Sequence, residues 1–294
     1  DLLPECPRVD QPRSRRVYVN RSLQFEHVAM VGFDMDYTIA IYKQDEMDRL
    51  GIEATARKLV ARGYPEQLLK MPYRTDFPVR GLHIDRRLGN VLKMDRYRYV
   101  KKAYHGMREL SRDERFQNYH STPVRPGSKR YHWVDTLYAL SEVAVYAAAV
   151  DVLDAESGDV DYERLFGDVR ECIDEAHREG HVASEISADF DRFLIRDPDL
   201  PHTLHHLRSA GKKLFLLTNS GPEYTEKAMS YLLGGARGDY SSWRGYFDII
   251  ISGACKPGFF VDSKRRFEPG EEGLEAPRRG FERGRIYRGG CLKA

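Results

Sequence analysis

Three short apolar runs stand out along the chain, and polar residues follow each of them. They are residues 28–33, 213–218 and 247–252. Runs of this length, rich in uncharged and β-branched side chains, are typical of strands buried in a parallel sheet. Between the second and third runs, residues 222–233 begin with a proline and predict a helix. A strand, a helix and a strand in this order predict a right-handed parallel crossover.

The residues between the first two runs have mainly helical periodicity. Residues 45–63, 135–153 and 161–180 each predict a helix, and the last two carry an apolar stripe at helical spacing. Residues 80–105 alternate more strongly and contain the turn Gly89–Asn90, which predicts a hairpin.

The fold class that follows is α/β. We expect a parallel-sheet, Rossmann-like core that is interrupted after its first strand by a large, mainly helical insertion. The corresponding parts are residues 1–45 for the first part of the core, 46–199 for the insertion and 200–294 for the second part. A short helix over 201–210 opens the second part, and residues 261–294 predict no definite element.

Composition excludes several classes of protein. The 294 residues include 47 Lys and Arg against 45 Asp and Glu, a net charge of +2, which lacks the basic surplus of a nucleic-acid-binding protein. No run of about 18 apolar residues predicts a membrane span. The four cysteines form no CxxC pair, which argues against a zinc site, and we expect buried thiols at Cys172 and Cys255.

Asp34, Asp36 and Thr38 form a DxDxT pattern directly after the first apolar run. Ligands of open parallel sheets bind beyond the carboxyl ends of the strands. A carboxylate placed there can attack phosphorus, and a second carboxyl two residues later can protonate the leaving group and then deprotonate water. The simpler interpretation is an acidic turn after a strand.

Polar residues follow the other two runs as well. Thr218, Asn219 and Ser220 precede the predicted helix, where a hydroxyl and backbone N–H groups can hold phosphate oxygens. Lys256 follows the third run and can neutralise both a nucleophilic carboxylate and a phosphate. Taken separately, a helix N-cap and a solvated lysine explain these residues equally well.

Together these motifs resemble those of haloacid dehalogenase-type phosphatases, with the insertion in the place of a cap. A closer resemblance is to the cytosolic purine 5′-nucleotidases, whose IMP- and GMP-preferring members have similar segments. The matching segments are GFDMDYTIAIYK from Gly32, RGLHIDRRLGNVLKMD from Arg80, DVRECIDEAH from Asp168, LTNSGPEYTEKAMSYL from Leu217 and FDIIISGACKPGFF from Phe247.

This resemblance implies a cytoplasmic, Mg²⁺-dependent hydrolase of purine nucleoside 5′-monophosphates, with phosphate transfer to another nucleoside as a second activity. Asp34 would form the aspartyl-phosphate, Asp36 would act as acid and then base, and Lys256 would assist. Thr218, Asn219, Ser220 and Lys256 would bind phosphate. Mg²⁺ would take a carboxylate oxygen of Asp34 and the backbone carbonyl of Asp36. The family includes oligomers, so the resemblance allows a homo-oligomer.

The resemblance also assigns residues that bind the nucleoside. At roughly 100° per residue, Arg170, Asp174 and His177 fall within about 60° of one another on the predicted helix. They match positions that line the family's nucleotide pocket, and Asp135 lies beside an aromatic run expected to flank the base or sugar. The simpler interpretation is a solvated helix face with one i,i+4 ion pair.

The chain departs from the family's pattern at two places. The resemblance implies a fourth motif with a further metal-binding aspartate after residues 287–290, and no such motif occurs before Ala294. Two explanations compete, a fragment of a longer protein and a naturally short, catalytically inactive chain, and we favour the fragment. The resemblance also implies a lysine soon after the face of Arg170, Asp174 and His177. His181 and Ala183 occupy that region here. Two rival functions remain: a phosphatase of another small phosphorylated metabolite, and a non-catalytic nucleotide-binding relative.

Overall fold

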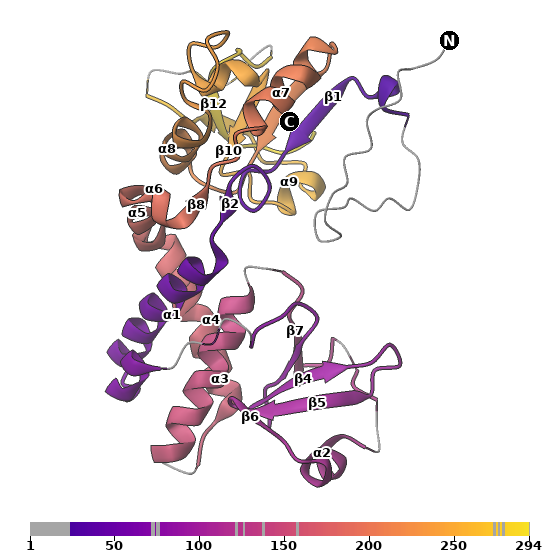
Figure 1. The fold of residues 1–294 in the computed structure, drawn as a ribbon, viewed down its shortest axis with the longest axis vertical. Helices are drawn as coiled ribbons and strands as arrows, with labels where there is room; N and C mark the ends of the chain where they lie inside the picture. The colour runs from indigo at the N-terminus through magenta and orange to yellow at the C-terminus, as the bar shows by residue number, and fades with distance from the viewer. Residues whose placement is uncertain are drawn as a thin grey trace.

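The computed structural model describes residues 24–293, apart from 72–73, 75–76, 121–122, 126, 137–138, 157–158, 273–274, 276 and 278–279. The described residues form two lobes (Figure 1). One contains the first strand and the C-terminal third of the chain. The other is built from residues between them. No helix in the described part of the chain has the length and apolar character that a membrane crossing requires.

The first lobe is built on a five-stranded sheet. Its strands, in spatial order, are β1 (Met30–Phe33), β9 (Lys213–Leu217), β10 (Ile249–Ser252), β12 (Ile286–Gly289) and β11 (Phe267–Pro269). The first four run parallel, and β11 pairs antiparallel with β12. The expected Rossmann-like parallel sheet and its crossover are therefore present.

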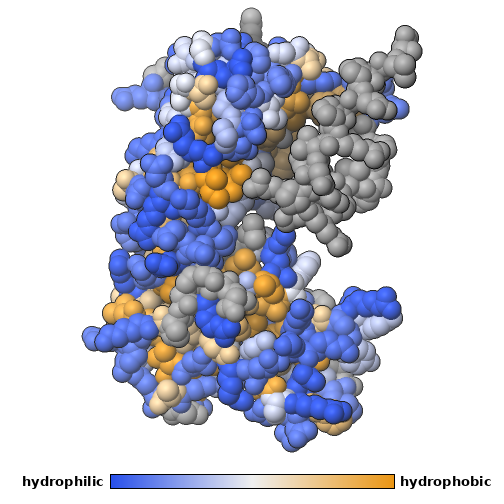
Figure 2. All heavy atoms as spheres, in the orientation of Figure 1, coloured by the Kyte–Doolittle hydropathy of each residue, from blue (hydrophilic) through white to orange (hydrophobic). Residues whose placement is uncertain are grey.

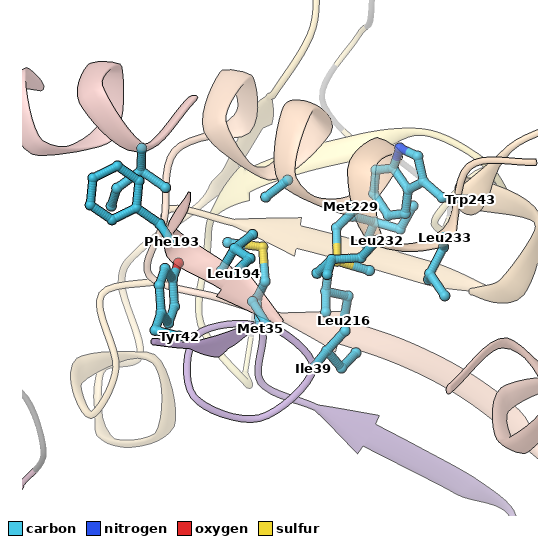
Figure 3. Packing of buried hydrophobic residues seen from close by; sticks show 14 of the residues in the cluster. Met35, Ile39, Tyr42, Phe193, Leu194, Leu216, Met229, Leu232, Leu233 and Trp243 are labelled. Carbon is cyan, nitrogen blue, oxygen red and sulfur yellow. The ribbon is translucent and has the colours of Figure 1, made fainter. Parts of the chain in front are cut away.

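Helices precede and follow the central strands β9 and β10 along the chain. α7 (Leu200–Ser209) leads into β9, α8 (Pro222–Leu233) connects β9 with β10, and the short α9 (Gly258–Val261) follows β10. α8 buries Met229, Leu232 and Leu233 against the sheet, where Leu216 lies beneath them (Figure 3). The helix predicted over residues 222–233 is confirmed at both ends.

Two expectations about the sheet are wrong. The first strand is not buried: β1 has only β9 as a neighbour, so it lies at the edge of the sheet, and Met30 is 42% exposed. Residues 261–294 are not without structure, because β11 and β12 lie there. These strands have three and four residues, too short for a clear alternation of apolar and polar positions.

The second lobe combines helices with a second sheet. α1 (Gln44–Ala61), α3 (Ala139–Glu156) and α4 (Tyr162–Arg178) pack against one another. Of the predicted helix over 135–153, residues 139–153 are helical and residues 135–136 are not, and the Thr136 hydroxyl accepts a hydrogen bond from the Ala139 backbone N–H.

The antiparallel sheet of this lobe is larger than the predicted hairpin. Its strands, in spatial order, are β6 (Arg108–Glu109), β5 (Val100–His105), β4 (Asn90–Met94), β3 (His83–Asp85) and β7 (Tyr131–Trp133). β3 and β4 form the expected hairpin around Gly89, with α2 (Arg112–Tyr119) beside the sheet. The lobe therefore contains a five-stranded sheet that helical periodicity alone does not predict.

The two lobes are joined along a narrow region. β2 (Ile41–Tyr42) pairs antiparallel with β8 (Leu194–Ile195), and α5 (His181–Ala188) and α6 (Phe190–Phe193) lie next to them. Leu50 of α1 packs into the apolar core of the first lobe, whereas Leu59 packs into that of the second. Most of the surface is hydrophilic, with apolar atoms visible near this junction (Figure 2).

Gly32 in β1 has no room for a side chain. A Cβ atom there would lie 2.0 Å from the tip of the Phe215 ring on β9. We predict that Gly32→Ala lowers the free energy of unfolding by about 1–3 kcal/mol, because the ring has to move out of its packing. Denaturant unfolding measures this, and the penalty should shrink in a Phe215→Leu background.

Gly167 of α4 provides the matched control. Nothing lies within 4 Å of a Cβ at that position. Gly167→Ala should raise the free energy of unfolding by about 0.5–1 kcal/mol, because alanine favours the helix. Equal effects at Gly32 and Gly167 would contradict the close approach of Phe215 to β1.

Candidate active site

The parallel register brings the three sequence motifs to one edge of the sheet. Phe33 of β1 lies opposite Leu216 of β9, and Leu217 lies opposite Ile251 of β10. Asp34 and Thr218 are therefore the first residues beyond two adjacent strands. The segment after Ser252 leads to Lys256 at the same edge. Parallel strands have their carboxyl ends on one side, which is where such sheets bind ligands.

Asp34 forms an ion pair with Lys256. The Lys256 Nζ lies 2.6 Å from Asp34 Oδ2 and also donates a hydrogen bond of 2.9 Å to the Leu217 carbonyl. The other carboxylate oxygen, Oδ1, accepts a hydrogen bond from the Met35 backbone N–H. The Asp34 side chain is 43% exposed, whereas that of Lys256 is 18% exposed. The carboxylate is thus held in place and still reachable from solvent.

A tight turn follows Asp34 and points Asp36 back toward the sheet. The Met35 carbonyl accepts hydrogen bonds from the backbone N–H groups of Thr38, Ile39 and Ala40. Met35 itself is fully buried in the apolar core (Figure 3). Because the Met35 side chain is buried in the core, the side chains of its two neighbours, Asp34 and Asp36, point away from the core.

Both carboxylate oxygens of Asp36 accept hydrogen bonds from hydroxyl groups. The Tyr42 hydroxyl donates to Oδ1 over 2.7 Å. The hydroxyls of Ser220 and Thr218 donate to Oδ2 over 2.7 and 3.2 Å. The Tyr42 hydroxyl also lies 2.8 Å from that of Tyr224 on α8. Residues from β2, the loop after β9 and α8 therefore converge on one carboxylate.

Asn219 connects the loops that follow β9 and β10. Its side-chain amide donates to the Lys256 carbonyl over 3.2 Å, and its Oδ1 accepts from the Lys256 backbone N–H over 2.6 Å. The Ser220 backbone N–H donates to the Thr218 hydroxyl, and the Ser220 carbonyl accepts from the Gly253 N–H. These contacts fix the position of Lys256 relative to the N-terminus of α8.

A cavity of about 600 Å³ opens beside Asp36. A volume of this size is in the range of small-molecule sites. Asp36, Asn219 and Ser220 form its polar wall. Its remaining wall is aromatic and apolar and comes from both lobes: Tyr37, Tyr42, Met47, Val182, Ala183, Ile186, Gly221 and Tyr224.

A second group of charged side chains lies in the other lobe. The carboxylate of Glu142 on α3 lies 3.6 Å from Arg170 Nε and 3.6 Å from His132 Nε2. Glu142 is 5% exposed, and its Oε2 has no hydrogen-bond partner. Burial raises the pKa of Glu142, while the positive charge of Arg170 opposes that rise. Burial, together with the charges of Arg170 and Arg86, lowers the pKa of His132.

The structure brings together six of the predicted site residues, namely Asp34, Asp36, Thr218, Asn219, Ser220 and Lys256. Arg170 lies instead beside Glu142 in the other lobe, and besides burial the negative charges of Asp174 and Asp135 contribute to raising the pKa of Glu142. None of these three lines the cavity beside Asp36. The side chain of His177 lies outside the described part of the structure.

The residues at the sheet edge fit a magnesium ion only in part. Mg²⁺ requires a near-octahedral set of oxygen ligands. The two carboxylate oxygens of Asp34 already contact Lys256 and the Met35 backbone N–H. Among the residues that the structure describes, no three His, Cys, Asp or Glu side chains gather as a metal site would.

Sequence reasoning did not identify Tyr42, Tyr224 or Glu142. The two tyrosines are 182 residues apart, so their contact has no local signal. Glu142 had one, since it is the one acid among residues 139–150, the apolar part of α3. The expectation for Cys255 is wrong: Cys172 is buried, but the Cys255 thiol is exposed on the loop after β10.

Comparison with known proteins gives consistent results. A model of the 5′ nucleotidase family matches residues 17–294. The chain is 31% identical over 312 residues to 5′-nucleotidase domain-containing protein 2 of Homo sapiens, covering 99% of this chain and 58% of that protein. The protein of the same name from Rattus norvegicus is 30% identical, with 99% and 54% covered.

A 5′-nucleotidase domain-containing protein of Dictyostelium discoideum is 31% identical over 290 residues, or 94% of this chain and 48% of that protein. The chain thus spans about half the length of these relatives. The family model covers nearly all of the chain, including both lobes and every motif at the sheet edge. This chain belongs to the 5′ nucleotidase family.

Proposed function

We propose that the protein hydrolyses purine nucleoside 5′-monophosphates of the IMP and GMP type through an aspartyl-phosphate at Asp34. The observation that carries this proposal is the 2.6 Å contact between Lys256 and Asp34 at the carboxyl end of the parallel sheet. A lysine there neutralises the nucleophile in the free enzyme and the phosphoryl group as charge develops on it. Family membership supports the same chemistry.

The reaction has two steps. In the first, an Asp34 oxygen attacks phosphorus, the bond from phosphorus to the leaving oxygen breaks, and Asp36 gives its proton to that oxygen. In the second, Asp36 takes a proton from water as the water attacks the acyl phosphate, and phosphate leaves. The Asp34 carboxylate and the Asp36 proton are then restored. A nucleoside hydroxyl in place of water would give phosphotransfer.

In this proposal the N-terminus of α8 and the loop before it form the phosphate-binding site. α8 has 12 residues, and the loop of Thr218, Asn219 and Ser220 precedes it. Backbone N–H groups at a helix N-terminus favour an anion. Thr218 and Asn219 are held by hydrogen bonds to neighbouring loops, so the phosphate-binding site is formed before substrate binds.

The second lobe acts as a cap in this proposal, and the three parts of the chain are residues 1–45, 46–199 and 200–294. Glu142 underneath Arg170 holds a guanidinium that is 46% exposed. Arg170 and the neighbouring Asp174 would offer donors and an acceptor to the edge of a purine, with Asp135 nearby. The proposal also includes Mg²⁺ dependence and a cytoplasmic location, and both rest on the resemblance to the cytosolic purine 5′-nucleotidases.

One observation favours a different substrate of the same chemistry. Ala183 lines the cavity beside Asp36, and no Lys or Arg side chain lines that cavity in the described chain. None of Arg170, Asp174 and Asp135 lines it either, so this mostly aromatic and apolar wall offers few hydrogen-bond partners to the edge of a purine. A phosphatase for another phosphorylated metabolite is therefore the second candidate.

Asp34→Asn tests the nucleophile. An amide cannot form the acyl phosphate, so release of phosphate from IMP should fall by at least about 10³-fold. A phosphate-release assay with added Mg²⁺ measures this. Asp262→Asn, on the same lobe and in contact with the Lys264 backbone N–H and Arg265, should leave the rate unchanged. Activity of the Asp34→Asn variant close to that of the wild type would exclude Asp34 as the nucleophile.

Arg170→Ala separates the two substrate candidates. If Arg170 binds the base, the variant should raise KM for IMP by about 10-fold or more and leave the hydrolysis of 4-nitrophenyl phosphate nearly unchanged. Arg164→Ala, on the same helix and 75% exposed, is the matched control. A variant that keeps the wild-type KM for IMP would favour the other phosphorylated metabolite.

Glu142→Gln tests the buried carboxyl beneath Arg170. Because burial raises its pKa, folding favours the protonated form, so its contribution to stability falls as pH rises above the unfolded value of about 4.3. The free energy of unfolding of the variant, relative to wild type, should therefore increase with pH above that value. Chemical denaturation across that pH range measures this, and a constant difference would contradict the burial of an ionisable carboxyl.

A further inference from the structure

The carboxyl of Asp36 accepts hydrogen bonds from three hydroxyl groups, and one of these hydroxyls does not belong to the motifs at the strand ends. Thr218 and Ser220 follow β9, but Tyr42 lies on β2, in the strand pair that joins the two lobes. Tyr42 alone contacts Oδ1, over 2.7 Å. The orientation of the carboxyl of Asp36 therefore depends on a residue outside the motifs.

The hydrogen bond between Tyr42 and Tyr224 can run in either direction, since either hydroxyl can be the donor across the 2.8 Å that separates them. When Asp36 is a carboxylate, Tyr224 donates to Tyr42 and Tyr42 donates to Oδ1. When Asp36 is protonated on Oδ1, Asp36 donates to Tyr42 and Tyr42 donates to Tyr224. The pair thus satisfies both protonation states of Asp36 without moving a heavy atom.

The surroundings keep Tyr42 a neutral, fixed hydroxyl. Its side chain is 8% exposed and packs in the apolar core (Figure 3). Its ring centroid lies 4.9 Å from that of Tyr37. Burial and the negative charge of Asp36 raise its pKa well above the ordinary value. Tyr42 and Tyr224 both line the cavity beside Asp36, so the pair lies next to the place where a leaving group would be.

We propose that Tyr42 is a positioning residue that orients the carboxyl of Asp36 through the 2.7 Å hydrogen bond to Oδ1, and that Tyr224, 2.8 Å from the Tyr42 hydroxyl, orients that hydroxyl. This inference rests on the proposed phosphatase activity and assigns a residue that the activity itself does not require. As the bond from phosphorus to the leaving oxygen breaks, the proton moves from Asp36 to that oxygen. The carboxylate that remains is stabilised by the Tyr42 O–H, and the direction of the chain reverses when water returns the proton.

The dependence of the rate on the leaving group tests the proposal. IMP leaves as an alkoxide that needs a proton, whereas 4-nitrophenyl phosphate leaves as a stabilised anion that does not. Tyr42→Phe should lower kcat/KM for IMP by about 10-fold or more and that for 4-nitrophenyl phosphate by less than about 3-fold. Tyr224→Phe should act in the same direction with a smaller effect, of about 3-fold on IMP.

Tyr231→Phe is the matched control. It lies on α8, as Tyr224 does, and donates a hydrogen bond of 2.6 Å to Asp191 away from the site. This variant should leave both substrates unaffected. Thermal unfolding of each variant checks that it folds. If Tyr42→Phe does not fold, the comparison of the two substrates is made with Tyr224→Phe.

Three results are informative against the proposal. Equal losses on both substrates would overturn it, because the tyrosine would then act on folding or phosphate binding. No loss on either substrate would also overturn it. A wild-type protein that releases phosphate from neither substrate would remove the proposed function, and the role of Tyr42 with it; in the other two results the phosphatase activity itself remains.

Discussion

The ion pair between Lys256 and Asp34 is the interaction on which the candidate site depends. It joins residues from loops that follow β10 and β1, which are not neighbours in the sheet, across the end of β9. The parallel register places these ends together, and the side chain of Asn219 holds the backbone of Lys256. Without the fixed loop, an exposed lysine and an exposed aspartate would gain little from pairing.

The same edge imposes a second constraint, on Asp36. An acid that alternates between two protonation states needs partners that can donate in one state and accept in the other. Hydroxyl groups do both, and three of them surround this carboxyl. The buried Met35 between the two acids keeps their separation fixed. Asp34 and Asp36 thus have different surroundings although they are two residues apart.

The sequence predicted which residues meet at the sheet edge better than it predicted the order and number of the strands. Asp34, Thr218 and Lys256 were identifiable because each follows an apolar run, and parallel strands collect such residues at one edge. The edge position of β1 was not identifiable, because the order of strands depends on contacts between distant segments. β11 and β12 are too short for periodicity to reveal them. Tyr42 and Tyr224 meet only through the fold, whereas Glu142 was visible as the one acid among residues 139–150, the apolar part of α3.

The central claim is that Asp34 carries the phosphoryl group during turnover. Rapid acid quenching of the protein during hydrolysis of IMP, followed by peptide mass spectrometry, tests it directly. The account predicts that the mass of one phosphoryl group appears on the peptide that contains Asp34, and that hydroxylamine removes it. Turnover with the phosphoryl group on another residue, or with no phosphorylated peptide at all, would contradict the account.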